Sequence, residues 1–295
     1  MEENRFGLKR RAFPPLPDTA LYYPATQHET ALAQLQRGIA EDEGILLLTG
    51  GAGAGKTLLG YLLVERLDEE VTSAFLTNSH FADRAALLQA ILYDLGLPID
   101  GSEQTLRLRL TEQLLKNCAD KRRTVVVMDE AQHLNADLLE ELRMLANLEA
   151  GTGKAVQFVL LAQASILVTM NHPALASLQQ RVSIRPALGE LGAEEAYDYL
   201  LHLLRLAGGK PEKIFDEAAL EVIARGTQGI PRCLNQAAHQ ALVLAEGGEL
   251  AKVDAEAALE ALSVLGMIAD EETEDAEPPD GEPPHPHIKK FKRTA

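Results

Sequence analysis

Residues 44–58 read GILLLTGGAGAGKTL, and this stretch decides the fold. Residues 44–49 form a short apolar run bounded by turn residues, which predicts a strand buried on both faces of a parallel sheet. Residues 50–57 then match G-x-x-x-x-G-K-[ST] at every defined position, directly before an apolar helical stretch. A strand, a glycine-rich loop and a helix in this order predict a phosphate-binding loop, in which backbone amides and the helix N-terminus face the phosphates.

The phosphate loop supplies most of the predicted nucleotide-binding residues. Lys56 carries the cation expected to contact the β- and γ-phosphates, and the Thr57 hydroxyl is an expected ligand of Mg²⁺. We therefore expect ATP and Mg²⁺ as cofactors. The expected nucleotide contacts are Gly50, Gly51, Ala52, Gly53, Ala54, Gly55, Lys56, Thr57 and Leu58.

An acidic motif completes the predicted site. The apolar run 125–128 ends in Asp129 and Glu130. The C-terminal ends of parallel strands converge on one crevice, so Asp129 is expected to hold Mg²⁺ and Glu130 to orient and deprotonate the attacking water. An ordinary buried strand with a solvated acidic end is the alternative, but it leaves the joint occurrence of the two motifs unexplained.

Two more polar residues are candidates for contact with the phosphates. Gln163 follows the apolar run 156–162 and is expected to hydrogen-bond the γ-phosphate or the attacking water, although polar residues also end strands for solubility alone. Arg232, in the stretch GIPR at 229–232, is expected in the first turn of a helix above the sheet, where it can reach phosphate. A surface salt bridge is the alternative for this arginine.

Alternation of strand-like and helical segments predicts the fold class. The pattern is typical of a parallel sheet between helical layers, so we predict an α/β fold of the three-layer αβα P-loop type. Further strand-like runs are 71–77, 124–128, 156–161 and, more weakly, 182–186, and the helical stretches are 26–39, 58–67, 81–95, 105–118 and 136–148.

After residue 192 only helical patterns remain, which predicts a small all-helical lid. Asp216 suits the N-cap of a helix closed by Gly226, and Pro231 suits the first turn of another that stops near residues 247–248. The proline-rich run 13–17 is expected to wrap the domain surface in extended form. The predicted segments are a lead-in with the first helix (1–40), an α/β nucleotide-binding domain (41–190), the lid (191–268) and a disordered acidic, proline-rich tail with a basic end (269–295).

Charge and membrane criteria exclude several classes of protein. The formal net charge of −16 excludes a uniformly basic nucleic-acid-binding surface, although residues 9–11 and 121–123 form local basic clusters. Polar residues interrupt the longest apolar stretch, 155–170, and the N-terminus lacks an apolar signal region, so no membrane insertion is expected. We therefore expect a cytoplasmic protein.

The cysteines and histidines predict no further metal or redox site. Cys118 and Cys233 lack the spacing of a disulfide framework or a zinc site and are expected to be reduced, buried thiols. His28 is followed by Glu29 but lacks the second histidine of a zinc-protease helix. The histidines at 285 and 287 lack further ligands, so we expect both histidine motifs to be exposed to solvent.

The combined motifs resemble one known family, the general-secretion-pathway protein A-like AAA+ ATPases, over residues 6–265. The resemblance implies an AAA+ module with a helical lid that hydrolyses ATP and works as a homo-oligomer. Secretion members of that family continue into a transmembrane helix and a peptidoglycan-binding domain, neither of which we find in this sequence. The residues that carry the resemblance are Phe6-Gly7-Leu8, Phe13, Pro17-Asp18, Leu21-Tyr22-Tyr23, the phosphate loop, the DEAQ tetrad 129–132, residues 139–143 and 147–149, and the GIPR stretch 229–232.

The resemblance also implies roles for single residues. An arginine of one subunit would act on the nucleotide of its neighbour, and the stretch LQQRV at 178–182 makes Arg181 the candidate, with Arg185 in reserve. Gln163 and Arg232 would be the two sensors of the nucleotide. The DEAQ tetrad is also similar to that of replication-initiator-type AAA+ proteins and transposon target-selection ATPases, so the biological process stays open.

Three functions remain as hypotheses. The first is an ATPase that drives assembly or remodelling of a protein partner. The second is a DNA-dependent ATPase, such as a transposition regulator, whose ring lines its pore with the basic clusters. The third is a nucleotide-binding scaffold without hydrolysis, which acts through its tail.

Overall fold

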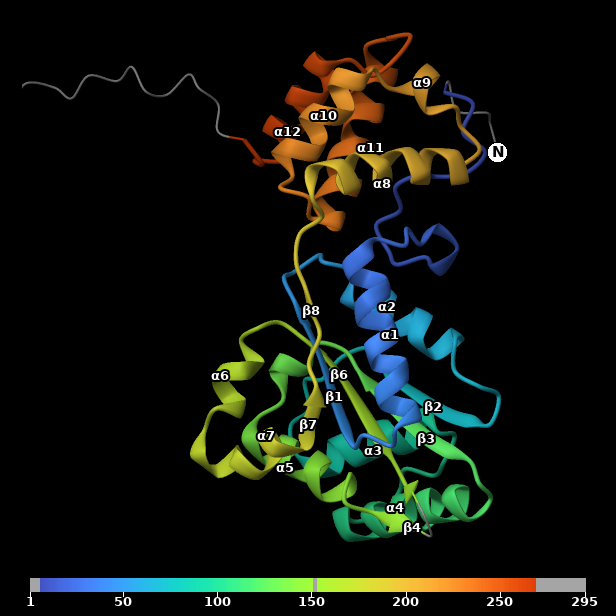
Figure 1. The fold of residues 1–295 in the computed structure, drawn as a ribbon, viewed down its shortest axis with the longest axis vertical. Coiled ribbons are helices and arrows are strands. Elements are labelled where there is room, and N and C mark those ends of the chain that lie inside the picture. The colour runs from blue at the N-terminus through green and yellow to red at the C-terminus, as the bar shows by residue number, and fades with distance from the viewer. Residues whose placement is uncertain (1–5, 151–152, 269–295) are drawn as a thin grey trace, which may run out of the picture.

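The computed structural model describes residues 6–150 and 153–268. Figure 1 shows an α/β body, built around a sheet, and a helical body stacked on it along the long axis. The predicted tail, 269–295, lies outside the described residues, and the predicted segment boundaries stay predictions. Across the described residues, no helix combines the length and the apolar character needed to cross a membrane.

The sheet confirms the predicted α/β class. Its strands are parallel and lie in the order β2-β3-β6-β1-β7, and β8 also pairs with β1. The strand before the phosphate loop, β1, therefore lies next to β6, and β6 lies next to β3, which leads to Asp129. The strands are β1 (Ile45–Gly50), β2 (Val71–Leu76), β3 (Arg123–Met128), β6 (Gln157–Ala162), β7 (Val182–Ile184) and β8 (Ala187–Leu188), and a separate hairpin joins β4 (Glu149–Ala150) to β5 (Gly153–Lys154).

Helices cover both faces of the sheet because alternate strand residues point to opposite sides. Leu46 and Val127 share a cluster with α1 and α2, whereas Leu47 and Val126 share another with α3, α4 and α5. The helices are α1 (Thr26–Ala40), α2 (Lys56–Glu65), α3 (Arg84–Asp94), α4 (Glu103–Ala119), α5 (Ala136–Leu145), α6 (Ile166–Met170) and α7 (Ala176–Arg181), with 3₁₀ turns η1 (Thr19–Leu21), η2 (Ala131–His133) and η3 (Pro173–Leu175).

Three helices, α2, α3 and α4, begin at other residues than the apolar pattern predicts, and side-chain caps fix the starts of α3 and α4. α3 begins at Arg84 instead of residue 81, since the Asp83 carboxylate accepts a hydrogen bond from the Ala86 amide. α4 begins two residues before Thr105, whose amide donates to the Ser102 hydroxyl. An oxygen that accepts from the amide three residues further on is a typical helix N-cap.

The second body is all-helical. Asp216 is the N-cap residue of α10, as predicted, but its carboxylate accepts from Lys252 Nζ at 3.2 Å and caps no amide of the helix. Pro231 begins α11, which ends at Gly247. The helices are α8 (Ala193–Leu206), α9 (Pro211–Ile214), α10 (Glu217–Gly226), α11 (Pro231–Gly247) and α12 (Ala255–Val264), and we call them the helical lid.

The lead-in, residues 6–25, packs on the helical lid. The proline-rich run 13–17 was expected to wrap the domain surface, and residues 15–17 are exposed, but Phe13 lies with Leu8 and Leu21 in the hydrophobic cluster of the helical lid. Phe13 is only 1% exposed. The lid core contains many alanines, such as Ala237 and Ala241, so the larger apolar side chains of the lead-in add buried apolar area that these helices lack.

A buried ion pair joins two helices on the face of the sheet away from the lead-in. Glu141 of α5 has a fully buried side chain, and Arg107 Nη2 of α4 donates to its Oε2 at 2.5 Å. Burial raises the pKa of Glu141, while Arg107 acts in the opposite direction. The charged form of Glu141 therefore depends chiefly on this arginine, with a smaller contribution from Arg84.

We expect Arg107→Met to lower the free energy of unfolding at pH 7.5 by about 3 kcal/mol, because it leaves a buried carboxylate without its cation. The raised pKa of Glu141 means that the folded state holds a proton more readily than the unfolded state. As the pH falls towards 5, protonation removes the unpaired charge from the variant, so its loss of unfolding free energy should shrink. Urea denaturation at both pH values measures it. Arg37→Met, which breaks the exposed pair with Glu41, is the control, and equal losses in the two variants would contradict the prediction.

Candidate nucleotide site

The order of the strands brings the predicted residues to one edge of the sheet. β1 leads into the phosphate loop, β3 into Asp129 and β6 into Gln163. These three strands are adjacent and parallel, with Leu48 opposite Leu161 and Met128 opposite Leu160, so their C-terminal ends lie side by side. The edge is where α/β sheets bind ligands.

The phosphate loop has the backbone shape that its glycines predict. Gly53 and Gly55 have φ angles of 80° and 95°, in the left-handed region that favours glycine. A Cβ atom at Gly53 would lie 2.7 Å from Cβ of Arg232, so the lid leaves no room for a side chain there. Lys56 begins α2 and is buried, and its Nζ donates to the carbonyl oxygens of Gly50 at 3.0 Å and Gly51 at 2.8 Å.

Thr57 and Asp129 meet directly. Thr57 Oγ1 donates to Asp129 Oδ2 at 2.5 Å, and Asp129 Oδ1 accepts from the Glu130 amide at 2.9 Å. Burial raises the pKa of Asp129. Mg²⁺ prefers oxygen ligands, and the Thr57 hydroxyl and the Asp129 carboxylate place two of them side by side. A bound cation would also offset the burial of the Asp129 charge. The residues therefore fit the predicted metal.

Glu130 is held by a residue that the sequence analysis did not select. Gln132 Nε2 donates to Glu130 Oε2, and Gln132 Oε1 accepts from the backbone N–H of Gln163 at 3.0 Å. Glu130 itself has a φ of 53°, and η2 follows it immediately. Gln132 thus links the two residues predicted to face the γ-phosphate. Its place in the DEAQ tetrad was the available signal.

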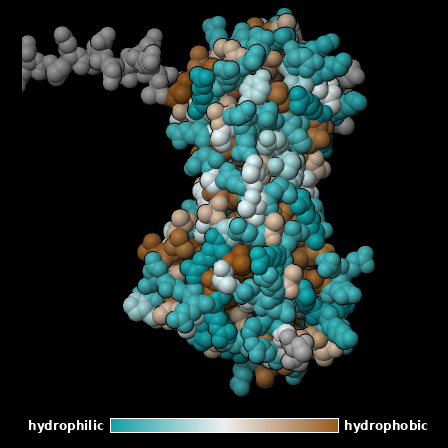
Figure 2. All heavy atoms as spheres, viewed as in Figure 1, coloured by the Kyte–Doolittle hydropathy of each residue, from teal (hydrophilic) through white to brown (hydrophobic). Residues whose placement is uncertain are grey.

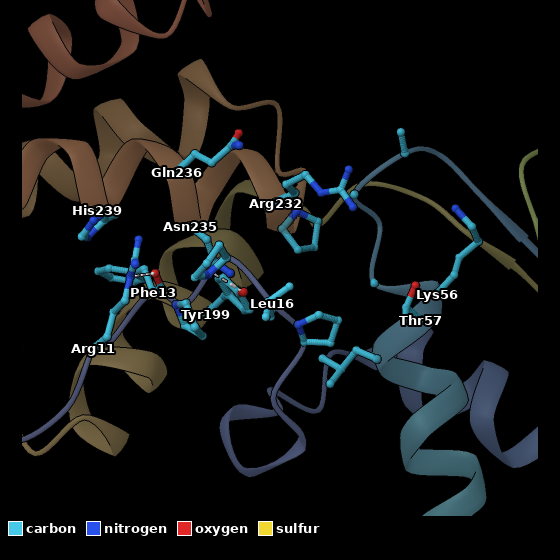
Figure 3. A pocket seen from close by; sticks show the side chains of 18 of the residues that line it. Arg11, Phe13, Leu16, Lys56, Thr57, Tyr199, Arg232, Asn235, Gln236 and His239 are labelled. Carbon is cyan, nitrogen blue, oxygen red and sulfur yellow. Dashed lines mark hydrogen bonds between the residues drawn. The ribbon is translucent and has the colours of Figure 1, made fainter. Parts of the chain in front are cut away.

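Arg232 reaches the site from the lid. It lies in the first turn of α11, and its amide donates to the Gly53 carbonyl at 3.2 Å. Figure 3 shows its side chain between the phosphate loop and the rest of the cavity. Within the described residues its guanidinium forms no salt bridge, so the alternative explanation for this arginine has no partner there. Burial lowers the pKa of Lys56, and the nearby Arg232 lowers it further.

A cavity of about 600 Å³ joins these residues to the lead-in. Lys56 and Thr57 lie at one end, with Arg232 beside them (Figure 3). Glu130, whose charge acts on Lys56, and Gln163 also line the cavity. The other walls come from segments that the sequence analysis did not assign to the site. They are the lead-in from Arg11 to Pro17 and the faces of α8 and α11 around Tyr199, Asn235 and His239.

The remaining candidates lie elsewhere. Arg181 is exposed at the end of α7 and does not line this cavity. Arg185 is tied to its own backbone, since it donates to the carbonyls of Val182, at 2.9 Å, and Gln179. Of the two arginines, Arg181 alone makes no hydrogen bond or ion pair within residues 6–150 and 153–268, although its charge helps to lower the pKa of Glu149.

Two smaller predictions need correction. His28 is 5% exposed instead of solvent-exposed, because it lies on the inner face of α1 against the phosphate loop. Cys118 and Cys233 are free thiols, as predicted, but both are half-buried instead of buried. The described residues hold no group of three or more metal-ligating side chains of the histidine, cysteine and carboxylate kind. The histidines at 285 and 287 lie outside the described residues.

Comparison with known proteins agrees with this geometry. Residues 39–170 match the family described as an AAA domain. The structure of the ORC2 protein of Aeropyrum pernix in its ADPNP-ADP complexes is similar over 86% of this chain and 71% of that chain, with 20% identity and a TM-score of 0.67. The structure of Drosophila ORC bound to DNA is similar over 90% of this chain and 66% of that chain, with 17% identity and a TM-score of 0.68. These two likenesses concern the fold.

The phosphate loop and the acidic end of β3 meet at one edge of a parallel sheet, under a helical lid. With the AAA-domain match, this arrangement defines the class of protein: the chain belongs to the AAA+ ATPase family. Within that class it is similar to General secretion pathway protein A of Aeromonas hydrophila, with 36% identity over 243 residues. The alignment covers 81% of this chain but spans only 44% of that protein.

Proposed function

We propose that the protein hydrolyses ATP with Mg²⁺ and uses the cycle to drive assembly or remodelling of a protein partner. The observation that carries the proposal is the 2.5 Å contact between Thr57 Oγ1 and Asp129 Oδ2, with Lys56 and Glu130 at the same end of one cavity. A metal-binding pair, a cation and a general base at one point are the parts that phosphoryl transfer needs.

The residues divide the work between binding and proton transfer. Mg²⁺, when bound to Thr57 and Asp129, would polarise the phosphoryl oxygens. The Lys56 ammonium has three N–H donors, of which the Gly50 and Gly51 carbonyls take two, so the third would serve a phosphate oxygen. Glu130 would accept the proton of the attacking water on a carboxylate oxygen, with Gln132 holding its other oxygen in place. The lead-in and α11 form the walls on either side of the remaining cavity, where the base of the nucleotide would lie.

Association of subunits is the second part of the proposal. Arg181 ends α7, which packs on α6, and α6 exposes Leu167 and Val168, the latter at 77%. Figure 2 shows a mostly hydrophilic face with hydrophobic side chains gathered around α6. Exposed apolar side chains beside an exposed arginine favour this surface as the one that meets the nucleotide site of a neighbouring copy.

A mixing experiment tests Arg181. We expect Arg181→Ala to lower ATP turnover about a thousandfold, as for other arginines supplied between subunits. Glu130→Gln retains Arg181 but lacks the base. In a random 1:1 mixture of these inactive variants, about a quarter of the sites pair an intact Glu130 with a neighbour's Arg181, so about a quarter of the wild-type rate should return.

Arg205→Ala, at an exposed arginine on α8, is the control and should behave like the wild type. A mixture no more active than the sum of its parts would refute action between subunits. Turnover that stays constant per subunit on dilution would refute the assembly requirement.

The similar proteins suggest two kinds of partner for this protein. General secretion pathway protein A suggests a protein complex as the target, and a cytoplasmic location would supply the ATP. DNA is the alternative partner, favoured by the fold shared with Drosophila ORC, whose structure was solved bound to DNA. Lys9 and Arg10 are exposed and available for such contact, whereas Arg123 lies 3.9 Å from Asp42. An ATP-dependent, salt-sensitive shift of duplex DNA would support the alternative, and no shift at low salt would exclude it.

A further inference from the structure

His28 touches the phosphate loop from behind. It lies in the first turns of α1, and its Nε2 is 2.9 Å from the carbonyl oxygen of Ala54. Because a carbonyl only accepts, Nε2 must carry the proton. Nδ1 is buried and has no hydrogen-bond partner among the described residues, and burial lowers the pKa of His28, which favours the neutral ring. His28 does not line the nucleotide cavity.

The two residues before His28 bind the lid and its connection to the sheet. Ala25, at the N-cap of α1, has no side chain that can cap the helix, and the carboxylate of Glu195 on α8 accepts from the first amide of the helix instead. The Glu195 Oε1 accepts from the amide and the hydroxyl of Thr26, both at 2.9 Å. Gln27 exchanges hydrogen bonds with the backbone of Gly189 and donates to the Glu190 carbonyl, in the segment between β8 and α8.

Three consecutive residues of one helical turn therefore contact three different parts of the molecule. Thr26 binds the lid, Gln27 binds the connection and His28 binds the loop. The lead-in just before them is fixed in the lid as well, since His202 Nε2 lies 2.9 Å from the Tyr22 carbonyl. On the other side of the loop, the amide of Arg232 donates to Gly53. The lid thus reaches neighbouring loop carbonyls by two routes, directly through α11 and indirectly through α1.

We propose that the first turn of α1 is a positioning element that couples the lid to the phosphate loop, with His28 setting the loop shape that binds nucleotide phosphates. The inference rests on the proposed function and adds a control of nucleotide affinity by residues that do not touch the nucleotide. A displaced α8 would move Thr26 through Glu195, and His28 follows because it lies only two residues further along a rigid helical turn.

Titration of MgADP, which cannot be hydrolysed further at this site, tests the coupling. We expect His28→Leu to raise the Kd for MgADP about fivefold, the effect of one lost hydrogen bond. His28→Gln offers an Nε2 donor and should restore the Kd to within about twofold. Glu195→Ala should also raise the Kd, although Glu195 does not line the cavity. In ATP turnover KM should rise with kcat nearly unchanged.

The double variant His28→Leu/Glu195→Ala separates coupling from two local defects. If α1 transmits the lid position through His28, the two effects on the Kd overlap and the double variant binds little worse than His28→Leu. Arg37→Ala, on the exposed face of the same helix, is the control and should leave the Kd unchanged. Additive effects, or a Kd unaffected by Glu195→Ala, would overturn the inference. If His28→Leu fails to fold, the Kd values of His28→Gln and Glu195→Ala for MgADP still test the coupling.

The outcome also distinguishes this inference from the proposed function. A wild-type protein that binds no MgADP would refute the proposed function itself. A wild-type protein that binds MgADP as tightly as His28→Leu does would refute the coupling and leave the proposed function intact.

Discussion

Replacing Glu130 by glutamine is expected to lower ATP turnover at least about a hundredfold while leaving ATP binding within about twofold of the wild type. Glutamine retains an oxygen that can accept from Gln132, so the side chain should keep its place. It cannot take a proton from the attacking water. The change therefore removes one chemical step and preserves the geometry around it.

Phosphate release measures turnover, and titration with a fluorescent ATP analogue measures binding. Glu140→Gln, on α5 and paired with Arg143, is the matched control because it makes the same change outside the cavity. Equal turnover in Glu130→Gln and the wild type would remove Glu130 from the mechanism, and no turnover in either under conditions that favour assembly would remove hydrolysis altogether.

Lys56→Ala should weaken ATP binding about a hundredfold, since hydrogen bonds to charged groups contribute about 1.5–3 kcal/mol each. The change removes the buried cation that the phosphate loop holds against the carbonyls of Gly50 and Gly51. Arg232 is the other cation beside the phosphate end, and it is exposed, so it cannot replace a buried ammonium group.

Isothermal calorimetry with MgATP measures this loss. Lys116→Ala, at an exposed lysine of α4, is the control and should bind like the wild type. Unchanged affinity in Lys56→Ala would refute the predicted site. A variant that loses ATP but retains every cellular function of the protein would instead favour a scaffold that needs no hydrolysis.

The sequence predicts the sheet and the phosphate end of the site because both depend on local patterns. A run such as residues 45–48 has one stable environment, the inside of a parallel sheet, and Gly53 and Gly55 mark left-handed positions whatever surrounds them. Once β1 and β3 belong to the same sheet, Thr57 and Asp129 approach each other as a consequence of strand direction.

The residues that sequence analysis missed depend on partners far along the chain. His28 faces Ala54 because α1 packs on α2, and no local pattern distinguishes it from an exposed histidine. Phe13 is buried by helices about two hundred residues later. Arg181 is a different case, since its proposed role requires a second copy of the chain and therefore stays a prediction.

The burial of the lead-in in the helical lid has a consequence for how the protein forms during synthesis. Leu8 and Phe13 leave the ribosome early, but the helices that cover them, up to α12, leave it last among the described residues. The α/β body can fold in between, as translation is slow compared with the folding of a compact unit. One wall of the nucleotide cavity is therefore completed only when the last helices have been made, so nascent chains stay unable to enclose ATP until then.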